Sequence, residues 1–275
     1  MPARYPERIV CLTEESTETL YLLGEERRIV GISGYTVRPP RARREKPRVS
    51  AFLSARTEKI LELKPDLVIG FSDLQADIAR DLTKAGLNVL IFNQRSVQEI
   101  LDMILALASL VGAADKGVAL IEKLEAGLNE IRAEGKAFAR KPRVYFEEWD
   151  EPMISGIRWV SELIEIAGGE DIFPEKSRSQ GASGRIVAAP QLVVEKNPDV
   201  ILGSWCGKKF RPERVAARPG WDAICAVRNN QLFEIKSADI LQPGPAALTD
   251  GVRRIHELLR DFVLPAARRR SSGGA

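Results

Sequence analysis

Two stretches of the sequence are copies of one short module: Ile60–Gly70 reads ILELKPDLVIG, and Val193–Gly203 reads VVEKNPDVILG. In both copies an apolar helical turn is expected to end before the proline, because a residue that precedes proline disfavours the helical conformation. The apolar run after Pro-Asp predicts a short buried strand. A chain that uses one module twice is expected to form two similar α/β lobes, which would face each other across a ligand-binding cleft.

The pattern around each module extends this prediction to the whole chain. Strands are expected at residues 8–13, 28–33, 67–70 and 87–92, with helices between them, and the same order restarts at 141–146. Strands that alternate with helices predict a mostly parallel sheet covered on both faces, which is the α/β class. Between the two halves, apolar residues recur at helical spacing without a proline, with Val111-Gly112-Ala113 as the place for an interruption. The predicted domains are an N-terminal lobe (1–95), a spine helix (96–138), a C-terminal lobe (139–265) and a disordered tail (266–275).

Composition restricts the possible partners. The 275 residues carry a net charge of +3, which is too small to indicate nucleic-acid binding. Arginine clusters at 41–48 and 268–270 have no interleaved aromatic residues, so they are interpreted as a solvated loop and a tail. The apolar segment 100–111 is too short to cross a bilayer. We therefore expect no nucleic acid, no membrane insertion and a monomer.

The reactive residue types give no sign of an enzyme. Cys11, Cys206 and Cys225 match no metal-binding spacing and are expected to be free and buried, as is typical of a reducing compartment. The single histidine, His256, falls inside the predicted closing helix, where a packing role is expected. The chain has no nucleophile elbow, phosphate-binding loop or Gly-x-Gly-x-x-Gly fingerprint. The expectation is a protein without catalysis, without a cofactor and without a metal site of its own.

Ligands of parallel α/β sheets bind beyond the carboxyl ends of the strands. This rule selects a set of residues rich in aromatic side chains: Tyr35, Arg38, Phe52, Phe71, Glu148, Trp149, Met153, Trp205 and Asp239. Large flat side chains beside a few polar groups suit a large flat ligand such as a corrin, a porphyrin or a siderophore. Other interpretations stay open: Phe52 and Phe71 as core residues, Glu147-Glu148 as a solvated turn, and Lys208-Lys209 as a solvated loop or as the neutralising partner of an anionic ligand edge.

Several short sequence motifs resemble those of a known family. They include Thr17-Glu18, Gly34-Tyr35, Ser155-Gly156, Glu165–Gly169 (EIAGG) and Asn197-Pro198-Asp199. In this order and spacing the chain resembles the class III periplasmic binding proteins, which serve ABC importers for vitamin B12, ferric siderophores and haem. The likeness runs over about 8–264 and is strongest to the vitamin B12 binders. It implies non-catalytic binding of a corrinoid in the interlobe cleft, for delivery to an importer.

The resemblance also implies roles for single residues. Aromatic ligand contacts of the vitamin B12 binders fall at positions matching Tyr35, Phe52 and Phe71, where this chain is aromatic too. A further aromatic contact falls at Met153, and a tryptophan contact falls near Arg185, so that part of the ligand wall differs. The permease is expected to dock through a glutamate on each lobe. Glu58 matches the first of these, whereas Gln191 stands at the second and cannot supply charge for a bidentate arginine pair.

Several alternatives remain at this stage. The ligand could be a ferric siderophore or haem instead of a corrinoid, and any cobalt or iron would arrive with it. A cytosolic chelatase-like enzyme and a partner protein without a ligand are possibilities of other classes. No signal peptide is recognisable in Met1–Arg8, which favours the cytoplasm, whereas the resemblance implies the periplasm or the cell surface.

Overall fold

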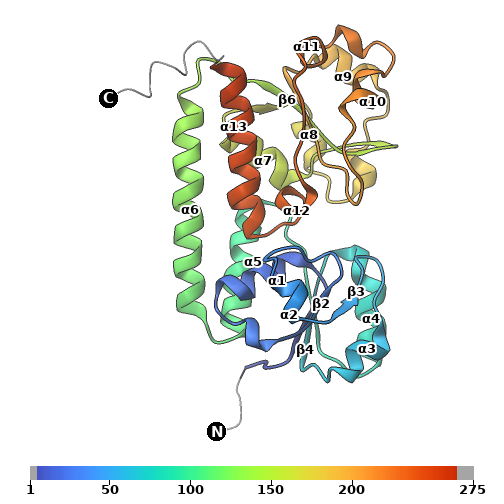
Figure 1. Ribbon diagram of the computed structural model, residues 1–275, viewed down its shortest axis with the longest axis vertical. Helices are drawn as coiled ribbons and strands as arrows, with labels where there is room; N and C mark the ends of the chain where they lie inside the picture. The colour runs from blue at the N-terminus through green and yellow to red at the C-terminus, as the bar shows by residue number, and fades with distance from the viewer. Residues whose placement is uncertain (1–4, 265–275) are drawn as a thin grey trace. The chain divides into compact units, whose positions relative to one another are not determined.

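The computed structural model describes residues 5–264, which form two compact units. Unit 1 contains the chain up to Gln94 together with Gln98–Leu124 and Gln242–Pro245, and unit 2 contains Arg95–Val97, Glu125–Leu241 and the chain from Ala246. Both units combine a parallel-rich sheet with helices, so the predicted α/β class is confirmed. Figure 1 labels their helices and some of their strands.

Unit 1 is built on a five-stranded sheet in which every neighbouring pair is parallel, in the order β3-β2-β1-β4-β5. Its strands are β1 (Ile9–Cys11), β2 (Ile29–Ser33), β3 (Arg48–Ser50), β4 (Leu67–Phe71) and β5 (Val89–Phe92). Its helices are α1 (Glu14–Leu22), α2 (Ala42–Glu45), α3 (Thr57–Glu62), α4 (Ala76–Lys84) and α5 (Val97–Leu110). Branched side chains of the strands pack against the helices, with Val10, Val68 and Leu82 fully buried.

Unit 2 repeats this plan with one antiparallel strand, in the order β10-β9-β6-β7, and β8 also pairs with β6. Its strands are β6 (Arg143–Asp150), β7 (Met153–Ser155), β8 (Glu170–Asp171), β9 (Val200–Gly203) and β10 (Leu232–Glu234). Its helices are α7 (Arg158–Ile166), α8 (Pro174–Ser177), α9 (Gln191–Lys196), α10 (Pro212–Ala216), α11 (Cys225–Arg228), α12 (Ser237–Ile240) and α13 (Val252–Val263).

The predicted spine consists of two helices, α5 and α6 (Ala114–Lys136), separated by a turn at Val111-Gly112-Ala113. Gly112 has a φ of +74°, which ends α5, and the ring of Tyr5 lies 2.5 Å from the place of a Cβ. Both the left-handed backbone and this close contact require glycine. The boundary between the two units falls within α6, after Leu124.

Helix α13 lies beside the second part of α6 (Figure 1). His256 of α13 stacks on the Phe138 ring, and its Nε2 atom lies 2.9 Å from the Glu134 carboxylate. Its Nδ1 atom is 3.0 Å from the carbonyl oxygen of Ala167. The single histidine therefore has a packing role, as the sequence predicted.

The aspartate of the repeated module performs the same task in both units. Asp66 Oδ1 accepts a hydrogen bond from the backbone N–H of Arg8 at 3.0 Å, and Asp199 Oδ2 accepts one from that of Arg143 at 2.9 Å. Arg8 precedes β1 and Arg143 begins β6, so each aspartate fixes the start of the neighbouring strand. The residue before the proline has a positive φ in both copies, at Lys64 and at Asn197. The likeness seen in the sequence is thus a likeness of backbone conformation and hydrogen bonding.

The three cysteines form no disulfide and lie in different surroundings. Cys11 is buried, and this burial raises the pKa of its thiol to about 12. Cys206 is exposed, so the expectation that all three are buried was wrong: the loop after β9 leaves it at the surface. Within residues 5–264, no helix combines the length and the apolar character needed to cross a membrane.

Candidate functional site

Unit 1 places its four predicted site residues at one edge of its sheet. Tyr35 and Arg38 follow β2, Phe52 follows β3, and Phe71 ends β4. Because these strands are parallel, their carboxyl ends share one edge. Tyr35 is 57% exposed, Phe52 is half-buried and Phe71 is buried. Tyr35 is therefore the aromatic side chain of this group that is most open to a ligand.

A buried amide holds two of these aromatic residues together. The Gln75 side chain donates from Nε2 to the carbonyl oxygen of Phe52 at 2.9 Å and accepts at Oε1 from the backbone N–H of Phe71 at 3.0 Å. Gln75 is fully buried, so no solvent competes for these bonds. No sequence pattern indicates this role, because Gln75 lies 23 positions along the chain from Phe52.

Acidic side chains gather at the same edge, in the first turns of α1. Arg38 Nε forms an ion pair with Glu18 Oε1 at 2.9 Å, and Glu14 Oε2 accepts a hydrogen bond from the backbone N–H of Val37 at 3.4 Å. Burial raises the pKa of the Glu14 carboxyl to about 8 and that of the Glu15 carboxyl to about 7. Neither carboxyl is therefore fully charged at neutral pH.

Glu15 is the most enclosed member of this group, with 2% of its surface exposed. Its Oε1 atom accepts a hydrogen bond from the Thr13 hydroxyl at 2.5 Å, and its Oε2 atom has no hydrogen-bond partner in the described part of the chain. Gly244 packs directly on it, since a Cβ at that position would lie 2.5 Å from the Glu15 Cβ. Among residues 5–264, no group of three or more acidic, cysteine or histidine side chains could hold a metal ion.

Unit 2 pairs two of its predicted site residues with each other. Arg185, 3% exposed, makes a bidentate ion pair with Glu148, with N–O distances of 2.5 and 2.9 Å. The same guanidinium donates to the carbonyl oxygen of Ser155 at 2.6 Å. These bonds fix Arg185 against β7, so its charge is already neutralised within the protein.

Glu147 lies at the centre of a buried polar network. Its carboxylate is fully buried and makes a bidentate ion pair with Arg218, at 2.6 and 2.9 Å. It also accepts from the Tyr145 hydroxyl at 3.0 Å and from Trp205 Nε1 at 3.1 Å. Burial alone would lower the pKa of Arg218, but the hydrogen bonds and charge of Glu147 raise it above its usual value. The interpretation of Glu147 as part of a solvated turn was wrong.

Lys208 connects the two tryptophans that were predicted to bind the ligand. Its Nζ atom lies 4.0 Å from the ring centroid of Trp149 and 5.1 Å from that of Trp205, and it forms an ion pair with Asp150. Trp205 is only 3% exposed, whereas Trp149 is half-buried and donates from Nε1 to the carbonyl oxygen of Glu151 at 2.9 Å. Trp149 thus keeps part of its surface open, while Trp205 belongs mainly to the core.

The other two predicted residues of unit 2 differ in exposure. Met153 is buried at the start of β7, directly opposite Asp150 of β6. Asp239 is half-buried in the short helix α12.

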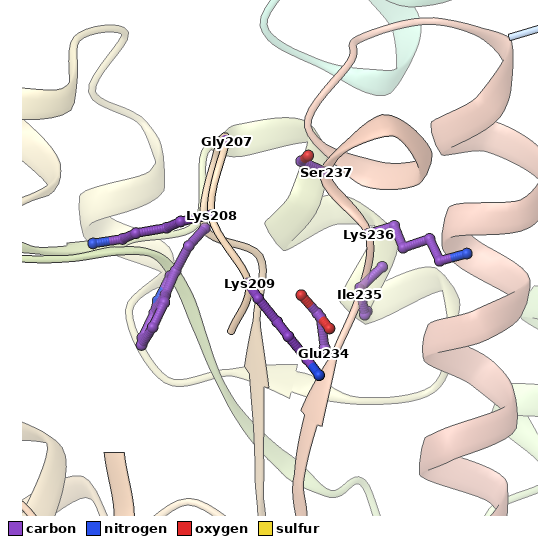
Figure 2. Close-up of a pocket in the computed structure, with 8 residues that line it drawn as sticks. Gly207, Lys208, Lys209, Glu234, Ile235, Lys236 and Ser237 are labelled. Atoms are coloured by element: carbon purple, nitrogen blue, oxygen red, sulfur yellow. The ribbon is translucent and has the colours of Figure 1, made fainter. Parts of the chain in front are cut away.

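An open pocket of about 250 Å³ lies at the carboxyl ends of β9 and β10 (Figure 2). Its lining comes from the loop after β9 and from the segment that leads from β10 into α12: Trp205, Gly207, Lys208, Lys209, Glu234, Ile235, Lys236 and Ser237. Lysine is the commonest residue type in this lining. The pocket therefore lies beyond the carboxyl ends of parallel strands, which is where ligands bind in such sheets.

The two candidate docking positions are equivalent within their units. Glu58 is exposed in the first turn of α3, and Gln191 is exposed as the first residue of α9. Each helix leads into a copy of the repeated module.

Comparison with known proteins gives the family. Residues 9–238 match the model of the periplasmic binding protein family. The chain belongs to this family. Its resemblance to solute-binding proteins of ABC importers is thereby confirmed. The match spans both sheets and includes the pocket-lining residues from Trp205 to Ser237.

Several proteins resemble the chain over most of its length. The vitamin B12-binding protein of Vibrio cholerae is 27% identical over 267 residues, covering 92% of this chain and 89% of that protein. The ABC transporter substrate-binding lipoprotein YvrC of Bacillus subtilis is 25% identical over 261 residues, with coverage of 92% and 79%. The solved structure of the heme-binding protein RhuT from Roseiflexus sp. RS-1 has a TM-score of 0.75 at 24% identity, with coverage of 92% and 99%, and shows the same fold.

Proposed function

We propose that this protein binds a corrinoid such as vitamin B12, without catalysis, and delivers it to an ABC importer. The observation that carries this proposal is the match to the vitamin B12-binding protein of Vibrio cholerae over 92% of the chain. The aromatic residues Tyr35, Phe52 and Phe71 at one sheet edge support it, because a corrin offers a wide, largely apolar face to such side chains.

Haem or a ferric siderophore is the alternative ligand. A porphyrin offers a flat face of similar size, and the fold shared with the heme-binding protein RhuT favours this alternative. For a corrinoid and for either alternative ligand, the metal ion is part of the ligand. Docking to the permease would then rest on Glu58, because Gln191 carries no charge for an arginine partner.

A chelatase-like enzyme is less well supported. Such an enzyme would need a histidine in its site to handle the metal, and the only histidine of the chain, His256, is buried in α13, where it stacks on Phe138. The proposal of binding without catalysis agrees with the character of the family.

Replacing Tyr35 or Trp149 by alanine is expected to weaken cyanocobalamin binding about tenfold or more in each case, since each change removes a ring that can stack on the corrin. Equilibrium dialysis, read by the visible absorbance of the corrin, measures the affinity without relying on the protein's own tryptophans. Tyr5→Ala is the matched control, because Tyr5 is also an exposed tyrosine but packs on Gly112. Unchanged affinity in both test variants would place the ligand elsewhere.

A further inference from the structure

Two consecutive lysines in the loop after β9 are used in different ways. The Lys208 ammonium is held by Asp150 and by the ring of Trp149. Figure 2 shows the Lys209 side chain extending in another direction, towards the carboxylate of Glu234. Lys208 therefore anchors the loop to β6, and this anchoring leaves Lys209 facing the pocket.

A second lysine lines the pocket from the segment after β10. Lys236 directly follows Ile235 after β10 and lines the pocket, with its side chain extending away from Glu234 (Figure 2). Within residues 5–264, neither Lys209 nor Lys236 forms an ion pair, and both are exposed. Both ammonium groups are therefore open to a group that enters from solvent.

The remaining charge of the pocket is small and positive. Lys208 is neutralised by Asp150, so Lys209 and Lys236 stand against one lining carboxylate, that of Glu234. Glu234 Oε1 already accepts a hydrogen bond from the backbone N–H of Phe210 at 3.0 Å. This bond satisfies part of its acceptor capacity and keeps the carboxylate in place.

We propose that this pocket is a subsite for an anionic oxygen group of the ligand, a carboxylate or a phosphate. Lys209 and Lys236 supply the charge, and the Ser237 hydroxyl is a neutral donor beside them. A volume of about 250 Å³ accepts such a group with a few waters, each of about 30 Å³, but not a macrocycle. The inference rests on the proposed function and adds to it that one edge of the bound chelate carries negative charge.

Paired probes that differ in their anionic group test this inference. One pair is haem and haem dimethyl ester, which lacks free carboxylates, and the other is cyanocobalamin and dicyanocobinamide, which lacks the phosphodiester. The double variant Lys209→Gln/Lys236→Gln is expected to bind the anionic member of the recognised pair about tenfold more weakly at low salt. Its affinity for the other member should stay within about twofold, because no charged partner is lost.

Two further variants sharpen the experiment. Glu234→Gln keeps a hydrogen-bond acceptor for Phe210 but removes the negative charge, so it should strengthen binding of the anionic member several-fold. Lys84→Gln/Lys123→Gln removes the same charge from exposed positions on other elements and should change neither affinity. High salt should reduce the effects of both pocket variants, because these charges are solvent-accessible.

The outcomes separate the two proposals. Equal losses of affinity for both members of a pair, or no loss of affinity in the lysine double variant, would overturn the anionic subsite and leave the proposed function intact. If the unmodified protein binds no member of either pair, binding of corrinoids and of haem both fail, and the subsite fails with them.

Discussion

Replacing Glu147 by alanine is expected to lower the free energy of unfolding by about 3–5 kcal/mol, because Arg218 would be left as a largely buried charge without its partner. The Arg218 side chain is only 16% exposed and directs both terminal nitrogens to Glu147. Tyr145 and Trp205 would lose their hydrogen-bond acceptor in the same change. Urea denaturation followed by far-ultraviolet circular dichroism measures the loss.

A double variant distinguishes a stranded charge from a loss of packing. Glu147→Leu combined with Arg218→Met removes both charges and keeps apolar volume, so it should recover most of the stability lost in Glu147→Ala. Glu213→Ala, at an exposed carboxylate on α10, should change the free energy of unfolding by less than about 0.5 kcal/mol. A loss below about 1 kcal/mol in Glu147→Ala would show that the network does not stabilise the fold.

Replacing Glu15 by glutamine is expected to stabilise the protein at pH 8 by up to about 3 kcal/mol and to have little effect near pH 4.5. Burial raises the pKa of Glu15 from the ordinary value of 4.5 to about 7 in the folded protein. The folded state therefore binds more protons than the unfolded state between these values, so stability falls as the pH rises through this window. Each tenfold difference in the acidity constant between the folded and the unfolded state changes the free energy of unfolding by about 1.4 kcal/mol.

The measurement is urea denaturation of both proteins at several pH values from 4.5 to 8. Glu58→Gln serves as the matched control, since it removes an exposed carboxylate from the first turn of another helix. A Glu15→Gln variant whose stability differs from that of the unmodified protein by the same amount at every pH would show that the effect does not come from ionisation of Glu15.

The sequence was sufficient to predict the fold because its signals are local. The proline of the repeated module ends a helix, and the short apolar run after it is typical of a buried strand between turns. The aspartate of each copy accepts a hydrogen bond from the backbone at the start of a strand. The sequences at these two strand starts are similar, Pro6-Glu7-Arg8 in one half and Pro142-Arg143 in the other. The break at Gly112 was also visible, as a glycine within a helical pattern.

The side-chain environment of the site could not be predicted in the same way. Trp205 follows a buried strand and lines the pocket, but its hydrogen bond from Nε1 to Glu147 joins residues 58 positions apart. Arg218 reaches the same carboxylate across 71 positions, and no pattern in the chain links these residues. Lys208 likewise meets Trp149 only through the pairing of β6 with β9. Strand ends could be located, whereas contacts among their side chains depend on the three-dimensional packing.

Native mass spectrometry measures directly whether one metal chelate binds to each chain. The protein is incubated with equimolar cyanocobalamin, haem and a ferric hydroxamate, and its intact mass is then recorded under non-denaturing conditions. We expect a single adduct per chain, with the mass of cyanocobalamin dominant and haem or the hydroxamate as the alternative. A spectrum that shows only the mass of the free protein would contradict this expectation.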